Sequence, residues 1–409
     1  MKKLRNGQAY AGRPATSVPM HPQQLSETHL HSLTVESGII PEVVVARGYR
    51  TLVDSKAIAT LGQPDEHGKL HYFAFDQRRA PALGVPLWNT AGVQTGWQIR
   101  PDTPRLGKDG KPLKYESPAG SAPMLDISPL TLPLLGDPAV MLAITEGAKK
   151  IDAIVSAARR EGIVLCGLNL TGVLGWLNNK YVLPAWRDVP LKERDVLLIF
   201  DSDVMSKPLV YLALKELLAF LHRREAKPRI VYLPQDKDGP KVGADDYLVQ
   251  GHTMASMLDL AEPTLRPVTP QDLAEALLKD IEALSKAARS DEPIYKKTVL
   301  ATFHALPWHV WAPIERRIKK LVPDISLNDL EKARSEAGQI EDDAVSEKAS
   351  ALADRLAKTF RETLVYDLDQ QCGPTALKLR YDLIASYRTG KTRMAASYSS
   401  ATSDNANSR

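Results

Sequence analysis

The chain has 409 residues, of which 44% are hydrophobic and 25% charged, with 53 Lys and Arg against 49 Asp and Glu and only two cysteines. These values are typical of a folded protein of two or three domains, and they exclude a disulfide-stapled module and a chain that is disordered throughout. The net charge of +4 permits binding to polyanions without indicating a particular one. No apolar run approaches the roughly 20 residues that span a bilayer, and no signal-peptide pattern follows the first lysines, so we expect a cytoplasmic protein without a membrane partner.

The first part of the chain changes in character twice. Residues 1–20 carry basic but no acidic side chains, interrupted by Gly, Pro and Ser, which predicts a disordered basic arm. Helix signals then cover residues 26–46, and short β-prone segments follow at 70–75 and 96–100. We therefore expect a small mixed α/β basic subdomain over residues 21–130.

Strands and helices alternate from residue 139 onward. Helical spacing covers residues 148–160 and 209–223, and the strand-like segments are 139–145, 163–166, 195–200 and 229–233. Strands that are separated by helices pair in parallel through crossovers. The pattern predicts an α/β fold over residues 131–262, with a parallel sheet flanked by helices.

Beyond a proline-rich stretch at 262–270, the strand signals end. Helical spacing predicts an all-helical C-terminal domain over residues 271–395, and Ser, Asn and Asp predict a disordered tail over 396–409. Residues 387–392 are similar to the last part of a phosphate-binding P-loop, but Ala385 stands where that fingerprint has glycine. We expect this segment to be a tail or the remnant of a longer protein.

Acidic residues follow two of the predicted strands. Glu146 ends the first strand and precedes Gly147, whereas Asp201 and Asp203 follow the third. The carboxyl ends of parallel strands border the ligand crevice of an open α/β sheet, and alternate residues of an extended strand share one face. Carboxylates without Cys or His nearby suit Mg²⁺ or Mn²⁺. Glu146, Asp201 and Asp203 are therefore the expected metal ligands and catalytic residues of a phosphoryl-transfer site.

The order of these signals resembles the Toprim domain of primases, topoisomerases and related nucleases. In that domain a strand ends in Glu-Gly before a helix, and a later strand ends in Asp-x-Asp. Residues 144–150, 200–203 and 241–248 are more narrowly similar to DUF3854, a Toprim-type domain of unknown function in plasmid and phage primase-helicases. Within the last segment we expect Asp245 to be a further metal ligand, with helix capping as the alternative.

The resemblance extends to the basic subdomain that precedes Toprim in bacterial-type primases, because residues 47–50, 98–100 and 114–118 are similar to its motifs in the same order. Two further lysines lie in the first turn of the helix after Glu146, where the helix dipole disfavours cations. A bound phosphate would explain their position, and the alternative is that they belong to a solvated helix face. The basic residues expected to bind nucleotide or DNA are Arg47, Arg50, Arg100, Lys114, Lys149 and Lys150.

Two features depart from the primase pattern. Lys150 stands where primases usually carry an acidic residue. His21, His29 and His31 lack the cysteine companions of a zinc ribbon, so we expect them at the surface or at helix ends.

The resemblance implies a primase-like protein of mobile-element DNA replication. It would transfer nucleotides from nucleoside triphosphates on a single-stranded DNA template, with Mg²⁺ or Mn²⁺ as cofactor, and its helical domain could dock a replicative helicase. Two alternatives remain. One is a Toprim nuclease that uses the same acids to cleave nucleic acid. The other is a non-catalytic, DNA-binding replication initiator, which Lys150 and the missing zinc ribbon favour.

Overall fold

The computed structural model describes residues 25–107, 112–178, 181–236 and 239–287, together with 310, 315–317 and 320. The expected basic arm, most of the expected C-terminal helical domain with its helicase contact, and the P-loop-like segment lie outside the described residues. None of the described helices is long and apolar enough to cross a membrane.

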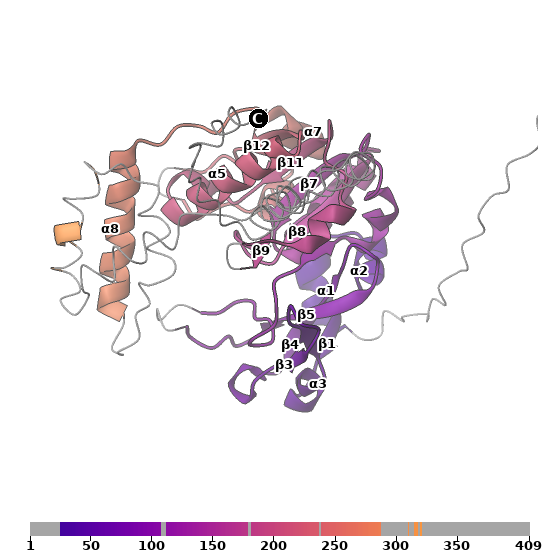
Figure 1. Cartoon of the computed structure of the whole chain (residues 1–409). Helices are drawn as coiled ribbons and strands as arrows, with labels where there is room; N and C mark the ends of the chain where they lie inside the picture. Colours follow the sequence, from indigo (N-terminus) through magenta and orange to yellow (C-terminus); the bar gives the residue numbers. More distant parts are fainter. Residues whose placement is uncertain are drawn as a thin grey trace, which may run out of the picture. The chain divides into compact units, whose positions relative to one another are not determined.

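The central part of the chain forms a six-stranded sheet with the strand order β13-β12-β11-β7-β8-β6. Figure 1 labels β12, β11, β7 and β8 of this sheet. Its four inner strands are parallel: β7 (Met141–Glu146), β8 (Leu165–Leu170), β11 (Asp195–Ile199) and β12 (Lys227–Val231). The two edge strands are antiparallel: β6 (Leu125–Ile127) and β13 (Ala261–Glu262). The expected α/β class with a mostly parallel sheet is confirmed.

Two hydrophobic clusters cover the two faces of this sheet. Along β7, Leu142 and Ile144 belong to one cluster and Ala143 to the other, as the alternation of side chains in a strand requires. Helix α5 (Pro208–Arg223) packs on the first face, together with the insert that contains β9 (Leu177–Asn178) and β10 (Tyr181–Val182). On the second face lie α4 (Ala148–Arg160), α6 (Ala244–Val249) and α7 (Met254–Asp259).

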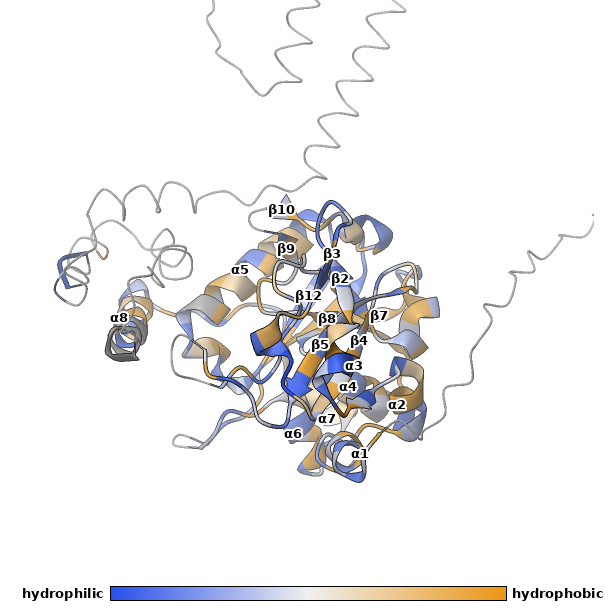
Figure 2. Ribbon diagram, turned by 90° about the horizontal axis from the view of Figure 1, so that it is seen from below, coloured by the Kyte–Doolittle hydropathy of each residue, from blue (hydrophilic) through white to orange (hydrophobic). Residues whose placement is uncertain are grey.

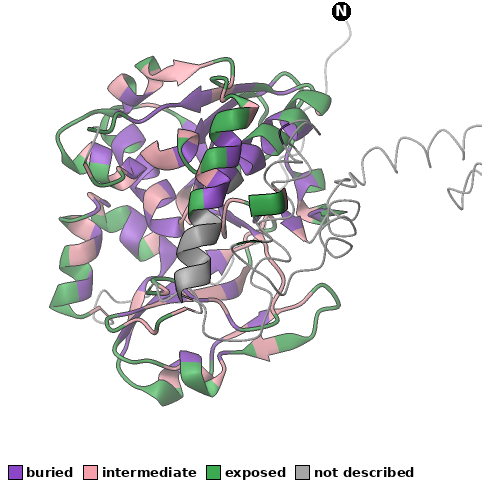
Figure 3. Ribbon diagram, turned by 90° about the vertical axis from the view of Figure 1, so that its left-hand side faces the viewer, coloured by how far each residue is buried: buried purple, intermediate pink, exposed green. Residues whose placement is uncertain are grey.

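The helices that cover the sheet turn an apolar face toward it. In α5 the buried leucines at 214, 217, 218 and 221 recur at the spacing of one helix face. The ribbon of α5 accordingly changes between hydrophobic and hydrophilic colours along its length (Figure 2), and buried residues lie along the strands and the inner helix faces (Figure 3). Helix α8 (Pro270–Ala287) follows the proline-rich stretch, as expected.

The chain before the main sheet forms small elements around a three-stranded sheet of order β1-β4-β5. The sheet consists of β1 (Arg50–Leu52), β4 (Ala82–Trp88) and β5 (Gln94–Pro101), and the other elements are α1 (Glu27–Thr34), α2 (Pro41–Arg47), α3 (Ser55–Ala59) and the hairpin β2 (Gly62–Pro64) and β3 (Leu70–Tyr72). Leu83, Val85 and Leu87 of β4 share a hydrophobic core with α4. The small sheet therefore packs against the main fold on the α4 side.

Short 3-10 helices complete the fold at η2 (Phe75–Gln77), η3 (Pro129–Leu134), η4 (Pro184–Asp188) and η5 (Ser202–Met205). Strand β6 lies inside the range expected for the basic subdomain, yet it pairs with β8 in the main sheet. The boundary between the two parts of the fold is therefore less sharp in space than composition suggested.

Candidate functional site

A pocket of about 450 Å³, which we call the site pocket, opens at the carboxyl ends of β7 and β11. Glu146 and Asp201 line it from these two strand ends. The small sheet contributes Arg100 from β5, and Lys114 and Tyr115 come from the segment after it. The other lining residues are Gln98, Gly147, Lys149, Lys150, Leu170, Thr171, Gly172, Lys241, Gly243, Asp245 and Asp246.

A glycine turn places Glu146 at the pocket. Gly147 has φ +109°, a conformation that side-chain-bearing residues rarely adopt, and it lets the chain turn from β7 into α4. The amide of Gly147 donates a 2.6 Å hydrogen bond to Oδ1 of Asn169, which is fully buried in β8. The turn that carries Glu146 is thus anchored to the neighbouring strand.

Asp201 is held by two lysines. Lys150 donates to Oδ1 of Asp201, and Nζ of Lys241 donates to Oδ2 at 2.6 Å. Burial acts to raise the pKa of Asp201, but the two ammonium groups outweigh it and hold the pKa below its ordinary value. Asp201 is therefore a stable carboxylate with both oxygens engaged.

Asp203 does not take the place that the sequence predicted. The strand ends at Ile199, and Asp201 occupies the position just before the 3-10 helix η5, which contains Asp203. Positions 201 and 203 are therefore not alternate residues of one extended strand. Asp203 is not among the residues that line the site pocket. Its negative charge nevertheless acts to raise the pKa of Glu146.

The carboxyl group of Glu146 binds its proton more tightly than usual. Burial is the main cause of its raised pKa; Lys150 opposes the rise, and the charges of Asp201 and Asp203 add to it. A carboxylate with a raised pKa is a better proton acceptor. Burial also raises the pKa of Asp245 in the same pocket, so both carboxyl groups are suited to accept a proton from a bound hydroxyl.

Four of the six predicted basic residues come together in the site pocket: Arg100, Lys114, Lys149 and Lys150. Arg100 also lies over the ring of Tyr115, at 5.6 Å from the ring centroid. Lys149 is buried, and its ammonium group donates to the backbone carbonyl and the hydroxyl of Ser32 at 3.3 and 3.2 Å.

Burial and the nearby charge of Arg100 lower the pKa of Lys149 to about 8. Between pH 8 and 10.5 the unfolded chain keeps a proton at this lysine that the folded protein has lost, so the free energy of unfolding rises with pH in this window. We expect Lys149→Met to remove this rise in urea unfolding measured at several pH values. Lys192→Met, at a lysine whose side chain is 75% exposed, should keep it. Equal pH profiles for the wild type and Lys149→Met would contradict the assignment.

The other two predicted basic residues lie outside the site pocket, and the expected contact of Arg47 with nucleotide or DNA is wrong. Its guanidinium is fully buried, donating two 2.8 Å hydrogen bonds to Asp152 and bonds of 2.6 and 2.7 Å to Asp126. It has no exposed surface with which to contact DNA. Arg50 lies over the ring of Trp97 at 4.1 Å and lines a different pocket.

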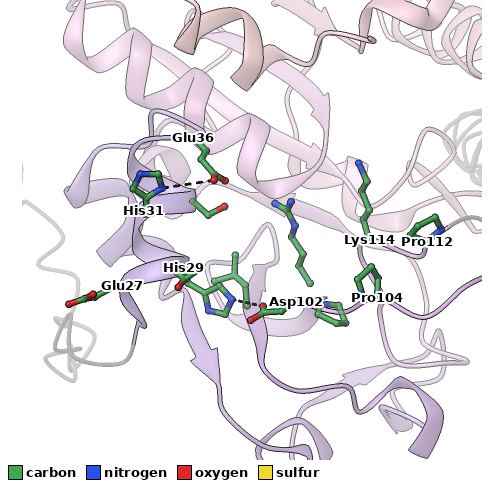
Figure 4. Close-up of a pocket in the computed structure, with 13 residues that line it drawn as sticks. Glu27, His29, His31, Glu36, Asp102, Pro104, Pro112 and Lys114 are labelled. Carbon is green, nitrogen blue, oxygen red and sulfur yellow. Dashed lines mark hydrogen bonds and ion pairs between the residues drawn. The ribbon is translucent and has the colours of Figure 1, made fainter.

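A second pocket, of about 840 Å³, shares Arg100 and Lys114 with the site pocket. In Figure 4, His31 and Glu36 lie on one side of it and Lys114 on the other. His29 is buried, with its ring nitrogens 2.8 Å from the Thr51 hydroxyl and 2.9 Å from Asp102. His29 is not at the surface, but it lies in the first turn of α1, so of the two expected positions it takes the one at a helix end.

Sequence reasoning missed two residues of the site. Lys241 begins a segment that was noted only for its resemblance, and Asn169 lies in a strand without any motif. No periodicity or spacing singles out either residue, because both act through contacts between distant parts of the chain.

The arrangement does not fit the divalent cation that the sequence predicted. Both oxygens of Asp201 accept hydrogen bonds from ammonium groups, which repel a dication. Asp245 lines the pocket, but its Oδ2 lies 3.3 Å from the donating hydroxyl of Ser37. Within the described residues, no three His, Cys, Asp or Glu side chains are placed to hold a metal ion together.

Residues 133–254, which contain the acidic residues of the site, match the family described as "Domain of unknown function (DUF3854)". The match covers this segment and not the chain as a whole. Its boundaries include Glu146, Asp201, Asp203 and Asp245, whereas Arg100 and Lys114 precede them. The expected match to this family is confirmed for this segment, and the site pocket is lined by residues of the matched segment and of the chain before it.

Solved structures of low sequence identity resemble this chain. The zinc-binding and RNA polymerase domains of Aquifex aeolicus primase are 12% identical, with a TM-score of 0.38 over 75% of this chain and 69% of that one. The RNA polymerase domain of Mycobacterium tuberculosis primase DnaG is 12% identical, with a TM-score of 0.37 over 76% and 92%. The E. coli primase catalytic core is 16% identical, with a TM-score of 0.36 over 75% and 94%. No curated protein matches the chain in sequence.

Proposed function

We propose that this protein is a primase-like component of DNA replication, which binds single-stranded DNA and a nucleoside triphosphate in the site pocket and joins nucleotides on the DNA template. The observation that supports the proposal most is the composition of the pocket. Acidic strand ends of the DUF3854 segment, Arg100 of the preceding sheet and Lys114 of the segment after it face one space. Nucleotidyl transfer needs both kinds of group, a proton acceptor and phosphate ligands.

In this proposal the residues of the chain have distinct roles. Basic side chains hold the triphosphate and the DNA backbone, because phosphate contacts position a strand without reading its sequence. The 3′-hydroxyl oxygen forms a bond to the α-phosphorus while the bond to the pyrophosphate oxygen breaks. Glu146 accepts the proton of the 3′-hydroxyl at its carboxylate. Asp201 orients Lys150 and Lys241 through the hydrogen bonds described above. Because the residues do not fit Mg²⁺ or Mn²⁺ as arranged, no step is assigned to a metal.

A second candidate function is a non-catalytic DNA-binding initiator. The pairing of Asp201 with Lys150 and Lys241 favours it, since this pairing leaves the carboxylate least available for chemistry. A nuclease that uses Glu146 and Asp201 is the third candidate, but no contact in the pocket favours it over the other two.

One assay separates these functions. The full chain is incubated with labelled nucleoside triphosphates and a single-stranded oligonucleotide, with Mg²⁺, with Mn²⁺ and with EDTA. Extended product supports the primase-like function, shortened oligonucleotide supports the nuclease, and retention of DNA without new products supports the initiator. Absence of both products and of DNA retention would contradict all three.

Removal of Arg100 and Lys114 tests the DNA contacts. Each phosphate that a cation neutralises contributes about 0.7 to the logarithmic salt slope for single strands, so Arg100→Ala/Lys114→Ala should lower the slope by about 1.4 and weaken binding to all sequences alike. Fluorescence anisotropy between 50 and 200 mM salt measures both effects. The control Lys192→Ala/Lys227→Ala removes two exposed lysines that form surface pairs with Glu225 and Glu193. Equal salt slopes in the two double variants would contradict the proposed contacts of Arg100 and Lys114 with DNA phosphates.

A further inference from the structure

We infer that the site pocket binds phosphate groups directly through the ammonium groups of Lys150 and Lys241, without a divalent cation. This inference deepens the proposed function and rests on it, because the phosphates are those of a nucleoside triphosphate or of a DNA strand. From the acidic strand ends we expected a metal ion to supply the positive charge of the site. The inference assigns this charge to two lysines instead.

The first step is the fixed position of the two charges. Lys150 comes from the first turn of α4 and Lys241 from the segment before α6, and both meet the carboxylate of Asp201, whose side chain is only 11% exposed. The Asp201 carboxylate pairs with both ammonium groups and holds them beside the pocket.

The second step is the hydrogen-bonding capacity that remains. An ammonium group has three donors, and Asp201 takes one from each lysine. The side chains of Lys150 and Lys241 are 22% and 57% exposed, so solvent or a ligand can reach them. The donors that Asp201 does not take are available to an anion in the pocket.

The third step is the charge of the surroundings. Five basic and four acidic side chains line the pocket, and Lys150 lies in the first turn of a 13-residue helix, where the dipole favours an anion and disfavours a cation. Of the acids, Asp246 is engaged within the protein, since its Oδ2 accepts a 2.9 Å hydrogen bond from the amide of Gly243. A bound phosphate satisfies both the helix terminus and the lysines, whereas a dication would have to displace two ammonium groups.

The test compares phosphate binding with and without divalent cations. Isothermal titration of the full chain with ATP, with tripolyphosphate and with a single-stranded oligonucleotide is carried out in EDTA and in Mg²⁺. We expect affinities in EDTA within about threefold of those in Mg²⁺ for at least one of these ligands, and the ligand that binds identifies the source of the phosphate. We further expect Lys150→Met/Lys241→Met to weaken that binding at least tenfold in EDTA, with partial rescue in Lys150→Arg/Lys241→Arg. Lys192→Met/Lys227→Met is the matched control and should bind as the wild type does.

A second measurement tests metal binding directly. Electron paramagnetic resonance of Mn²⁺ added to the wild-type chain should show no stoichiometric Mn²⁺ binding that depends on Asp201. Any binding of that kind would be lost in Asp201→Asn. Such a bound Mn²⁺, or phosphate binding that disappears in EDTA, would overturn the inference and leave a metal-dependent primase-like function standing. Binding in EDTA without nucleotide transfer would keep the inference and remove the catalytic function. No phosphate binding in either condition would overturn the inference.

Discussion

Arg47→Met is expected to lower the free energy of unfolding by about 3–5 kcal/mol, because it leaves buried carboxylates without their counter-ion. Asp126 and Asp152 are both fully buried, and Arg47 supplies hydrogen bonds to each. These three residues come from β6, α4 and α2, so the ion pairs tie the first helices of the chain to the main sheet.

Urea unfolding followed by circular dichroism measures this loss. Arg266→Met is the control, because Arg266 forms an i,i+4 pair with Glu262 at the surface, and such pairs contribute about 0–1 kcal/mol. If the two variants lose similar amounts of stability, the buried network does not carry the energy assigned to it.

Asn169→Ala is the second substitution with a large expected effect, a loss of about 2–4 kcal/mol. Its side chain accepts from the amide of Gly147 and donates to Asp126 at 3.0 Å, and it has no exposed surface. The alanine variant would leave the partly buried Gly147 amide without its acceptor and Asp126 with one donor fewer. The Glu146–Gly147 turn should therefore open more often, which hydrogen exchange of the Gly147 amide detects as faster exchange.

Asn178→Ala provides the comparison, since Asn178 donates to Glu66 in an exposed hydrogen bond. We expect this variant to unfold within about 0.5 kcal/mol of the wild type, as is usual for surface substitutions. Unchanged exchange at Gly147 in Asn169→Ala would contradict an anchoring role for Asn169, even if the variant were less stable.

Together, Arg47 and Asn169 connect the small sheet to the acidic strand ends. Asp126 accepts from both residues and also from the amide of Trp88 in β4, at 2.8 Å. A chain of buried and partly buried hydrogen bonds thus runs from the N-terminal elements to the turn that carries Glu146. Substitutions that weaken this network are expected to move the two walls of the site pocket relative to each other.

The inner strands and the helices of the main fold were predictable from local pattern. β7, β11 and α4 show their periodicity within a few residues, because one face or both faces of each element must be apolar to join the core. Glu146 and Asp201 could be placed at one edge of the sheet for the same reason, since consecutive parallel strands bring their carboxyl ends together. The edge strands β6 and β13, of three and two residues, are too short to show a period.

The sequence by itself therefore determined the class of fold, the DUF3854 segment and the acidic strand ends, all of which depend on residues near one another in the chain. Only the tertiary structure decided what the charged residues do. Arg47 looks like any basic residue of a binding surface until the fold buries it between two carboxylates, and Lys241 gains its role only by meeting Asp201 across 40 positions of sequence. The physical reason is that the state of a charged side chain is set by burial and by partners in space, which local sequence does not contain.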